Sequence, residues 1–248
     1  MKKALVVGGA NGIGLSIATN LANSDYDLVY IVDKTTVQNK YNNSKFKYIQ
    51  FDLTAGDYSI FDKLQDIDTL MITAGFGHLE LFRNVSEQYI SNSFIVNSVA
   101  PIRIIHHYMD KLMSQDNFHC GIMVSIAGFM SSPFFAVYGA TKAALKIFIE
   151  SVNIELEKGG STNRILNVSP GSIKGTSFNN GQTDLSQTEQ LANDILAHLE
   201  NKDDLFIPKY DEIFREVLER YHADFREEGR HSYDYKLERI KTSLHNEK

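Results

Sequence analysis

The chain has 248 residues, 43% of them hydrophobic, which is enough for the core of one large α/β domain. Its formal net charge of -6 argues against a nucleic-acid partner, because such a partner calls for a basic face. The single cysteine, Cys120, excludes an internal disulfide and a thiol-based zinc site, and we expect it to be a small buried apolar residue.

The amino terminus begins like a secretion signal, but it reaches paired glycines after only four apolar residues. No later run approaches the roughly 20 apolar residues of a membrane-spanning helix. No spacing of His or Cys residues indicates a catalytic metal. We therefore expect a cytoplasmic protein with no membrane partner and no metal.

A short apolar run at 4–7 predicts a buried strand, and four glycines follow it closely. Apolar residues then recur at helical spacing, at Ile13, Ile17, Ala18 and Leu21. Strand, glycine turn and helix form the context of a dinucleotide site, because glycines let the backbone approach a pyrophosphate and the helix amino terminus offers free N–H groups. The glycines are Gly8, Gly9, Gly12 and Gly14.

The next predicted strand, at 28–32, ends in Asp33, which lies 25 residues after Gly8. A carboxylate at this point can accept both ribose hydroxyls of NAD and would repel the 2'-phosphate of NADP. An ordinary turn residue at a strand end is the competing interpretation, and the neighbouring Lys34 would soften the repulsion. The sequence therefore favours NAD over NADP as the cofactor.

Further strands are predicted at 48–51, 69–73, 121–125 and 164–168, and residues 53–66 leave room for only a short helix. A long helical segment runs from Ser86, its predicted N-cap, to Met113. Pro101 lies inside this segment and predicts a bend near residues 97–101.

Strands that alternate with helices predict an α/β fold with a doubly wound, Rossmann-type parallel sheet, as a single domain at 1–208. Ligands of such sheets bind at the carboxyl edge of the strands. Six candidate residues fall at such edges, and we expect them to converge on one crevice: Gly8, Asp33, Asp52, Gly75, Ser125 and Pro170.

The helix predicted at 137–158 carries Tyr138 and Lys142 on one face, with Ser125 thirteen residues before Tyr138. Bringing the pKa of a tyrosine from about 10 to about 7 needs roughly 4 kcal/mol of stabilisation of the phenolate. An ammonium about 4 Å away supplies approximately that much at an effective dielectric constant of about 20. The spacing therefore predicts an acidic phenol, although a surface Tyr beside a solvated Lys has the same spacing. Ser125 would hold the oxygen that gains or loses the proton.

The segment from Ser172 to Gln187 is rich in Gly, Asn, Ser and Thr, and we interpret it as a mobile lid rather than an ordinary surface loop. A helix at 188–199 and a short strand at 205–208 follow. Residues 209–248 hold 19 charged side chains and two apolar stripes, which predict a helical carboxyl-terminal extension docked on the body or on another subunit. The stripes are Phe214, Val217, Leu218, Tyr221 and Phe225, then Tyr233, Leu237, Ile240 and Leu244.

Together, the Gly8-x-x-x-Gly12-x-Gly14 pattern and the Ser, Tyr and Lys set resemble the compact branch of the short-chain dehydrogenase/reductase family, over residues 3–176. The resemblance implies NAD(P)-dependent hydride transfer between nicotinamide and a carbonyl or alcohol carbon of a small molecule, with Tyr138 as the general acid and base. It implies a catalytic set of Asn97, Ser125, Tyr138 and Lys142, in which Asn97 anchors a water-mediated proton path.

The same resemblance implies which residues contact the cofactor. The pyrophosphate would lie on the glycine-rich turn, the adenosine on the ends of the second and third strands, and the nicotinamide beside the turn after the sixth. The residues concerned are Gly8, Gly12, Ile13, Gly14, Asp33, Asp52, Leu53, Ala74, Gly75, Tyr138, Lys142, Pro170, Gly171 and Ile173.

The sequence departs from the family pattern at four places, one of which is Thr176, which lies one residue later than the family's carboxamide-binding threonine because Gly175 intervenes. Val7 replaces a threonine before the first glycine, and Thr73 replaces the asparagine of an Asn-Ala-Gly motif, both at structural hydrogen-bonding positions. The charged segment 209–248 stands where the family has a Val-Asp-Gly-Gly carboxyl end, so the family's subunit arrangement does not carry over automatically.

Several questions stay open at this level. A catalytically silent NAD(H)-binding sensor or scaffold protein fits the same residues, as does an enzyme of this fold that dehydrates or epimerises its substrate. His78, just past the Ala74-Gly75 turn, is interpreted as a loop histidine, and an approach to the substrate is the alternative. The apolar circumference of the 137–158 helix predicts a homodimer or homotetramer.

Four side chains between Ser125 and Tyr138 predict an apolar substrate wall or else a subunit interface: Phe129, Met130, Phe134 and Phe135.

Overall fold

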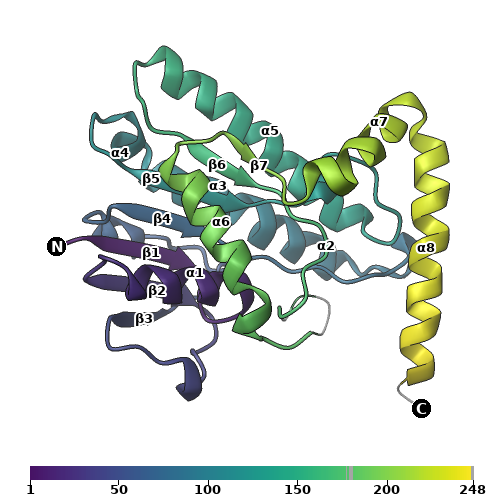
Figure 1. The fold of residues 1–248 in the computed structure, drawn as a ribbon, viewed down its shortest axis with the longest axis horizontal. Helices are drawn as coiled ribbons and strands as arrows, with labels where there is room; N and C mark the ends of the chain where they lie inside the picture. The colour runs from purple at the N-terminus through teal and green to yellow at the C-terminus, as the bar shows by residue number, and fades with distance from the viewer. Residues whose placement is uncertain (177, 179–180, 247–248) are drawn as a thin grey trace.

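Within the part of the chain that the structure describes, seven parallel strands form one sheet in the order β3-β2-β1-β4-β5-β6-β7 (Figure 1). The structure is a computed structural model that describes residues 1–176, 178 and 181–246, with side chains described as far as Glu238. The predicted doubly wound parallel sheet is confirmed. The strands are β1 Lys3–Val7, β2 Leu28–Asp33, β3 Phe46–Gln50, β4 Thr69–Ile72, β5 His119–Met123, β6 Ile165–Val168 and β7 Leu205–Phe206.

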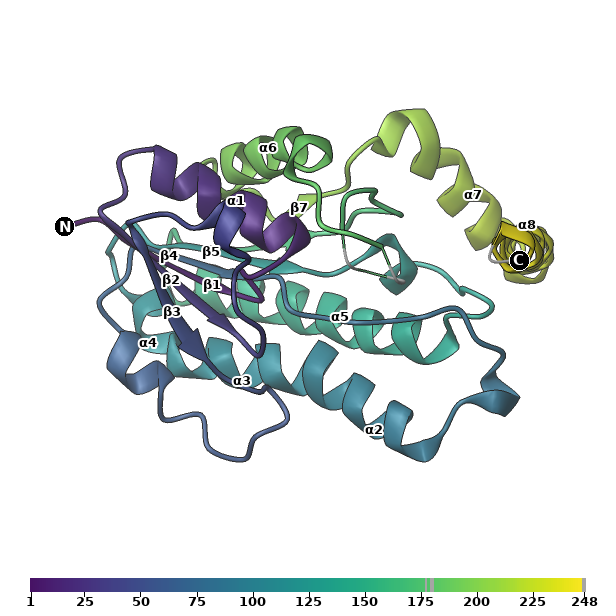
Figure 2. The same cartoon turned by 90° about the horizontal axis from the view of Figure 1, so that it is seen from below.

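Helices cover both faces of this sheet, because the central strands are apolar on both sides (Figure 2). On one face, α1 (Gly12–Asn23) and α6 (Glu189–Glu200) lie side by side and are joined by a hydrogen bond between Asn20 and Asn193. The other face is covered by α3 (Ala100–His107), α4 (Met109–Met113) and α5 (Ala136–Lys158), with α2 (Glu87–Phe94) leading into α3.

Two strands begin two residues before their predicted starts, at Phe46 and at His119. The reason is pairing: Phe46 lies opposite Val29 of β2, and His119 lies opposite Thr69 of β4. Main-chain pairing with a neighbouring strand therefore extends each strand beyond its apolar run. The short helix expected within 53–66 is a single 3-10 turn at Phe61–Leu64.

The bend predicted near residues 97–101 is a π-helical turn at Ile95–Val99, between α2 and α3. Ser86 is the N-cap of α2, as predicted, and its hydroxyl accepts a hydrogen bond from the Tyr89 backbone N–H. The wider π turn places Asn97 and Ser98 in the buried interior, against α5. Helix distortion thus brings a predicted catalytic residue to the centre of the molecule.

The carboxyl-terminal extension forms two helices after a π turn at Tyr210–Phe214, namely α7 (Arg215–Ala223) and α8 (Phe225–Asn246). In Figure 1 α8 runs along the outer edge of the molecule, beyond α7. An ion pair of 2.8 Å between Arg220 and Glu228 joins the two helices.

Members of the first apolar stripe of the extension differ in their surroundings. Phe214 and Leu218 pack against Ile207, whereas Phe225 is 49% exposed. The predicted members Ile240 and Leu244 lie outside the described side chains. No helix in the described part of the chain is both long and apolar enough to cross a membrane.

Candidate active site

The turn between β1 and α1 approaches the end of β4 so closely that only glycine fits. Gly8 has a φ of +83°, and a Cβ atom on it would lie 2.4 Å from the backbone nitrogen of Ala74. A Cβ atom on Gly14 would lie 2.3 Å from the carbonyl oxygen of Gly8. The Thr73 hydroxyl donates to the carbonyl oxygens of Val7 and Gly8, at 3.0 and 3.1 Å. Thr73 therefore still makes a structural bond at the position where the family has asparagine.

The amino terminus of α1 presents backbone donors at the carboxyl edge of the sheet. Its N-cap residue, Asn11, makes no capping bond, because its side-chain amide donates to the Thr35 hydroxyl instead. The N–H of Gly12, where φ is +50°, donates to the Thr183 hydroxyl at 3.1 Å. A hydroxyl oxygen thus lies where the helix dipole favours the oxygen of an anion.

The Asp33 carboxylate lies directly beside this turn. Its Oδ2 atom accepts from the backbone N–H of Ala10 at 3.0 Å, and its Oδ1 atom accepts from the backbone and hydroxyl of Thr35. Beyond β3, the N–H and hydroxyl of Thr54 hold the pKa of Asp52 below its usual range. Next to Asp52, Leu53 is buried.

The predicted residues Gly75, Asn97 and Lys142 converge behind the edge of β4. A Cβ atom on Gly75 would lie 3.4 Å from both Asn97 Oδ1 and Lys142 Nζ. Asn97 is fully buried: its amide donates to the Phe76 carbonyl and the Thr141 hydroxyl, and its oxygen accepts from the Phe76 N–H. Asn97 therefore fixes the loop after β4 to α5.

The side chains of Tyr138 and Ser125 lie next to each other at the end of β5, and Ser125 acts to lower the pKa of Tyr138. Burial nevertheless raises the pKa of Tyr138 to about 12. Lys142 is 2% exposed, its ammonium donates to the Met123 carbonyl at 2.8 Å, and burial lowers its pKa to about 7. Its Nζ atom lies 5.7 Å from the centre of the Tyr138 ring.

These two pKa shifts are opposite to the expectation from spacing alone. The sequence predicted an acidic phenol next to a charged ammonium, but burial dominates at both groups and favours a neutral phenol. The prediction of an acidic phenol from the Tyr-Lys spacing is thus wrong for this arrangement, because it counted one charge and no desolvation.

The side chain of Ser125 lies between the Tyr138 hydroxyl and the turn after β6. The Ser125 hydroxyl donates to the Pro170 carbonyl at 3.4 Å, and the same carbonyl accepts from the Ile126 N–H. The neighbouring Gly171 leaves room for the Phe214 ring, because a Cβ atom there would lie 2.6 Å from it. The carbonyl of Ile173 accepts from the Thr176 hydroxyl, and the side chain of Thr176 packs on Gly12.

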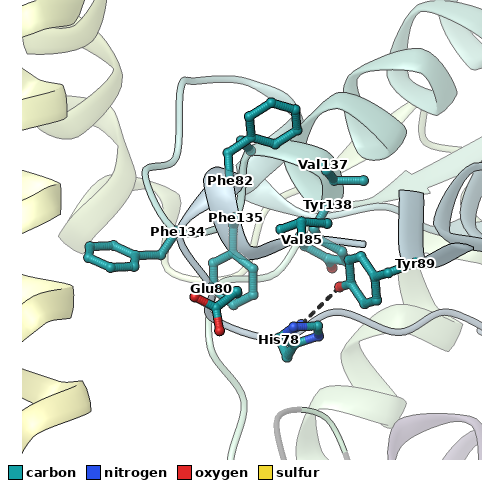
Figure 3. A pocket seen from close by; sticks show the side chains of 10 residues that line it. His78, Glu80, Phe82, Val85, Tyr89, Phe134, Phe135, Val137 and Tyr138 are labelled. Carbon is teal, nitrogen blue, oxygen red and sulfur yellow. Dashed lines mark hydrogen bonds between the residues drawn. The ribbon is translucent and has the colours of Figure 1, made fainter. Parts of the chain in front are cut away.

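A small cavity opens beside Tyr138 (Figure 3). Apolar side chains make up most of its wall, and His78 and Glu80 lie at its polar side; the apolar members are Phe82, Val85, Phe134, Phe135, Ala136 and Val137. Two of the four predicted wall residues do not reach it. Phe129 and Met130 pack instead against Ile126, Ile207 and Leu218.

Sequence reasoning missed two contacts from the segment 172–187, of which residues 177, 179 and 180 lie outside the described residues. The Phe178 ring lies 5.3 Å from the Tyr138 ring, and the Thr183 hydroxyl accepts a hydrogen bond from the Gly12 N–H. The same segment therefore contacts both the glycine turn and Tyr138. Its Gly and Ser content predicted an irregular segment but could not say which side chains would point inward.

Comparison with known proteins gives one consistent family. The profile of the short chain dehydrogenase family matches residues 2–187. An uncharacterized oxidoreductase from Staphylococcus epidermidis is 26% identical over 197 residues, covering 71% of this chain and 82% of the relative. A short-chain dehydrogenase from Pyricularia oryzae is 26% identical over 183 residues, covering 69% of this chain and 63% of the relative.

Solved structures share the fold. A short-chain dehydrogenase from Sphingobium yanoikuyae in complex with NADPH has a TM-score of 0.72 at 19% identity, covering 90% of this chain and 96% of that chain. A bulky-bulky ketone specific alcohol dehydrogenase from Comamonas testosteroni has a TM-score of 0.72 at 20% identity, covering 100% and 95%.

The glycine cradle, the backbone donors at the amino terminus of α1 and the Asp33 carboxylate fit a dinucleotide in shape and in donor chemistry. The family profile extends over the whole of this site. The chain belongs to the short-chain dehydrogenase family, and this family membership and its fold make it an NAD(P)-dependent oxidoreductase.

Proposed function

We propose that this protein transfers hydride between nicotinamide and a carbonyl or alcohol carbon of a small molecule, with Tyr138 as the general acid and base. The observation that carries the proposal is the pairing of Tyr138 with Ser125 at the mouth of an apolar cavity, with Lys142 buried behind. The cofactor would supply or accept the hydride, and the chain's own residues would position the substrate and move the proton.

The residues that would hold the cofactor follow the carboxyl edge of the sheet. The glycine turn with Ile13 would hold the pyrophosphate, Asp33 the adenosine ribose, and Asp52 with Leu53 the adenine. Ala74 and Gly75 would flank the cofactor, and Lys142 and Tyr138 would contact it near the nicotinamide. The turn of Pro170, Gly171 and Ile173 would support the nicotinamide.

The protonation states favour reduction of a carbonyl. With a pKa of about 12, Tyr138 carries its proton at neutral pH and can give it to the oxygen of the substrate. Ser125 would hold that oxygen, because its side chain lies next to Tyr138 at the end of β5. Asn97, which fixes the loop after β4 to α5, would anchor the path by which the proton is replaced.

The choice of cofactor would depend on Asp33. Its carboxylate is already held beside the glycine turn by Ala10 and Thr35, so it could not swing away from a 2'-phosphate without breaking three hydrogen bonds. We therefore favour NAD over NADP.

The cavity beside Tyr138 indicates an apolar substituent on the substrate. Phe82, Val85, Phe135 and Val137 offer apolar surface, whereas His78 is exposed at the entrance. An apolar group next to the carbonyl carbon would lie against this wall.

The test is single-turnover oxidation of bound NADH by a panel of aldehydes, ketones and keto-sugars, with product analysis for the net change of the cofactor. Oxidation with formation of one alcohol per NADH supports the proposal. NADH that binds but is never oxidised supports the silent sensor or scaffold instead. Product formation without net change of the cofactor supports dehydration or epimerisation.

A further inference from the structure

The turn that precedes α5 has a strained residue next to the proposed substrate wall. Phe134 has a φ of +64°, in the left-handed region that bulky residues rarely adopt. Its side chain is buried and points toward α8, away from the cavity centre (Figure 3). The next residue, Phe135, turns the other way, and its ring lies 5.4 Å from that of Tyr138. The strained turn therefore determines the position of the Phe135 ring, which forms the cavity wall next to Tyr138.

Contacts from two sides hold this turn. On one side, the backbone N–H of Glu80 donates to the Phe134 carbonyl at 2.9 Å. On the other side, the Tyr233 ring of α8 lies 4.8 Å from the Phe134 ring. A strained backbone conformation persists only where surrounding contacts fix it. The hydrogen bond from Glu80 and the ring contact with Tyr233 are therefore both expected to hold Phe134.

Lys236, one turn further along α8, makes the polar part of this contact. Its ammonium donates to the Ser132 hydroxyl at 2.5 Å and to the Pro133 carbonyl at 3.0 Å, and it lies 5.5 Å from the centre of the Phe135 ring. Lys236 is half-buried in this position, and burial lowers its pKa to about 8. One side chain of α8 thus contacts three of the four residues at 132–135.

We propose that Lys236 is a positioning residue that fixes the aromatic wall beside Tyr138, so that α8 determines which substituents the substrate cavity accepts. This inference rests on the proposed function, because it assigns the cavity beside Tyr138 to the substrate. Lys236 acts through Ser132, Pro133 and Phe135, and it touches neither the reacting atoms nor the glycine turn.

The first arm of the test needs no turnover. Hydrogen–deuterium exchange of the backbone amides in 131–137 is compared in the wild type, Lys236→Met and Lys158→Met. The last is a matched control at an exposed lysine at the far end of α5. Lys236→Met should speed exchange in this segment by about fivefold or more, and Lys158→Met should leave it unchanged. Equal exchange in all three proteins would overturn the proposal.

The second arm measures KM and kcat with NADH, using acetaldehyde as the small substrate and propiophenone as the bulky one. Lys236→Met should raise the KM for propiophenone by about fivefold or more relative to acetaldehyde, and the KM for NADH should change by less than about twofold. Faster exchange with an unchanged ratio of the two KM values would show that Lys236 stabilises the turn without affecting which substrates the cavity accepts. This result would overturn the proposal. If the wild type reduces neither compound, a small and a bulky carbonyl compound that oxidise NADH in the single-turnover panel replace them. If no compound of the panel oxidises NADH, the proposed function fails, and the exchange arm still decides whether Lys236 holds the wall.

Two further variants protect the test against simple loss of folding. Lys236→Arg keeps the charge and the donors, so it should restore most of the exchange protection. Ser132→Ala removes one acceptor from the other side of the contact. If the contact is real, combining Ser132→Ala with Lys236→Met should add little to Lys236→Met alone, whereas full additivity would contradict a direct interaction.

Discussion

Tyr138 and Lys142 illustrate what sequence spacing can and cannot predict about single residues. Their separation of four residues correctly predicted one helix face, and the family motif correctly pointed to Ser125 as a neighbour of Tyr138. The direction of the pKa shifts could not be predicted, because it depends on burial by Phe135 and by Phe178, which lies 40 residues after Tyr138 in the chain. Desolvation is a sum over tertiary contacts and leaves no local signal.

The buried amine of Lys142 should cost stability. Its pKa falls from 10.5 to about 7 on folding, so between about pH 7 and pH 10.5 the unfolded chain binds more protons than the folded one, and the penalty is complete below about pH 7. Lys142→Met should therefore be more stable than the wild type at about pH 6. Its advantage should shrink by roughly 3 kcal/mol between about pH 6 and about pH 9. Urea unfolding at both pH values measures this, and a pH-independent difference would refute it.

Asp33 offers a second residue-scale prediction. Asp33→Ala removes the carboxylate that would repel a 2'-phosphate, so the ratio of kcat/KM for NADPH to that for NADH should rise by about tenfold or more. Asp52→Ala serves as a control, because Asp52 lies beyond β3 and should not face the 2'-position. An unchanged ratio in Asp33→Ala would remove Asp33 from the cofactor site.

At the scale of elements, the local sequence predicted which kind of element forms. It did not predict what causes the bend in a helix or which distant residues a helix contacts. Pro101 predicted a bend, but the bend is a π turn that begins six residues earlier. Apolar stripes predicted two terminal helices, but docking of α8 on the turn at 132–135 joins residues about 100 positions apart, as in the bond between Lys236 and Ser132. The sequence contains no local mark of such a contact.

The π turn should be sensitive to loss of Asn97. Asn97→Ala leaves the backbone N–H and carbonyl of Phe76 without their partner in a buried place, so it should lower the free energy of unfolding by about 1–3 kcal/mol. Asn92→Ala, on α2 before the turn, should cost less than about 0.5 kcal/mol. Equal losses in the two variants, measured by chemical denaturation, would mean that Asn97 does not hold the turn.

At the scale of the whole molecule, the parallel sheet explains why so much of the site could be predicted. All parallel strands end at the same edge, so strand-end residues such as Gly8, Asp33 and Ser125 had to meet once the strands were identified. The cavity wall was predicted only in part, because Phe129 and Met130 pack against a cluster that includes Leu218 of α7 and do not line the cavity.

The outer face of α5 supports the prediction of a homodimer or homotetramer. Ile147 and Ile154 are each 58% exposed on this helix, and Phe94 and Val99 are exposed on the neighbouring α2 and π turn. We expect a dimer or tetramer at micromolar concentration, and Ile154→Glu should weaken association by about tenfold or more. Sedimentation velocity tests this prediction. A wild type that stays monomeric would contradict it.

In the proposed mechanism, Tyr138 moves the proton during hydride transfer in the pocket at the end of β5. The decisive experiment compares the single-turnover rate of NADH oxidation in Tyr138→Phe and in the wild type, together with the affinity of each protein for NADH. We expect the rate to fall by about 100-fold or more with NADH affinity unchanged, because the ring remains and only the hydroxyl is removed. A Tyr138→Phe variant that keeps more than about a tenth of the wild-type rate would exclude Tyr138 as the general acid and base.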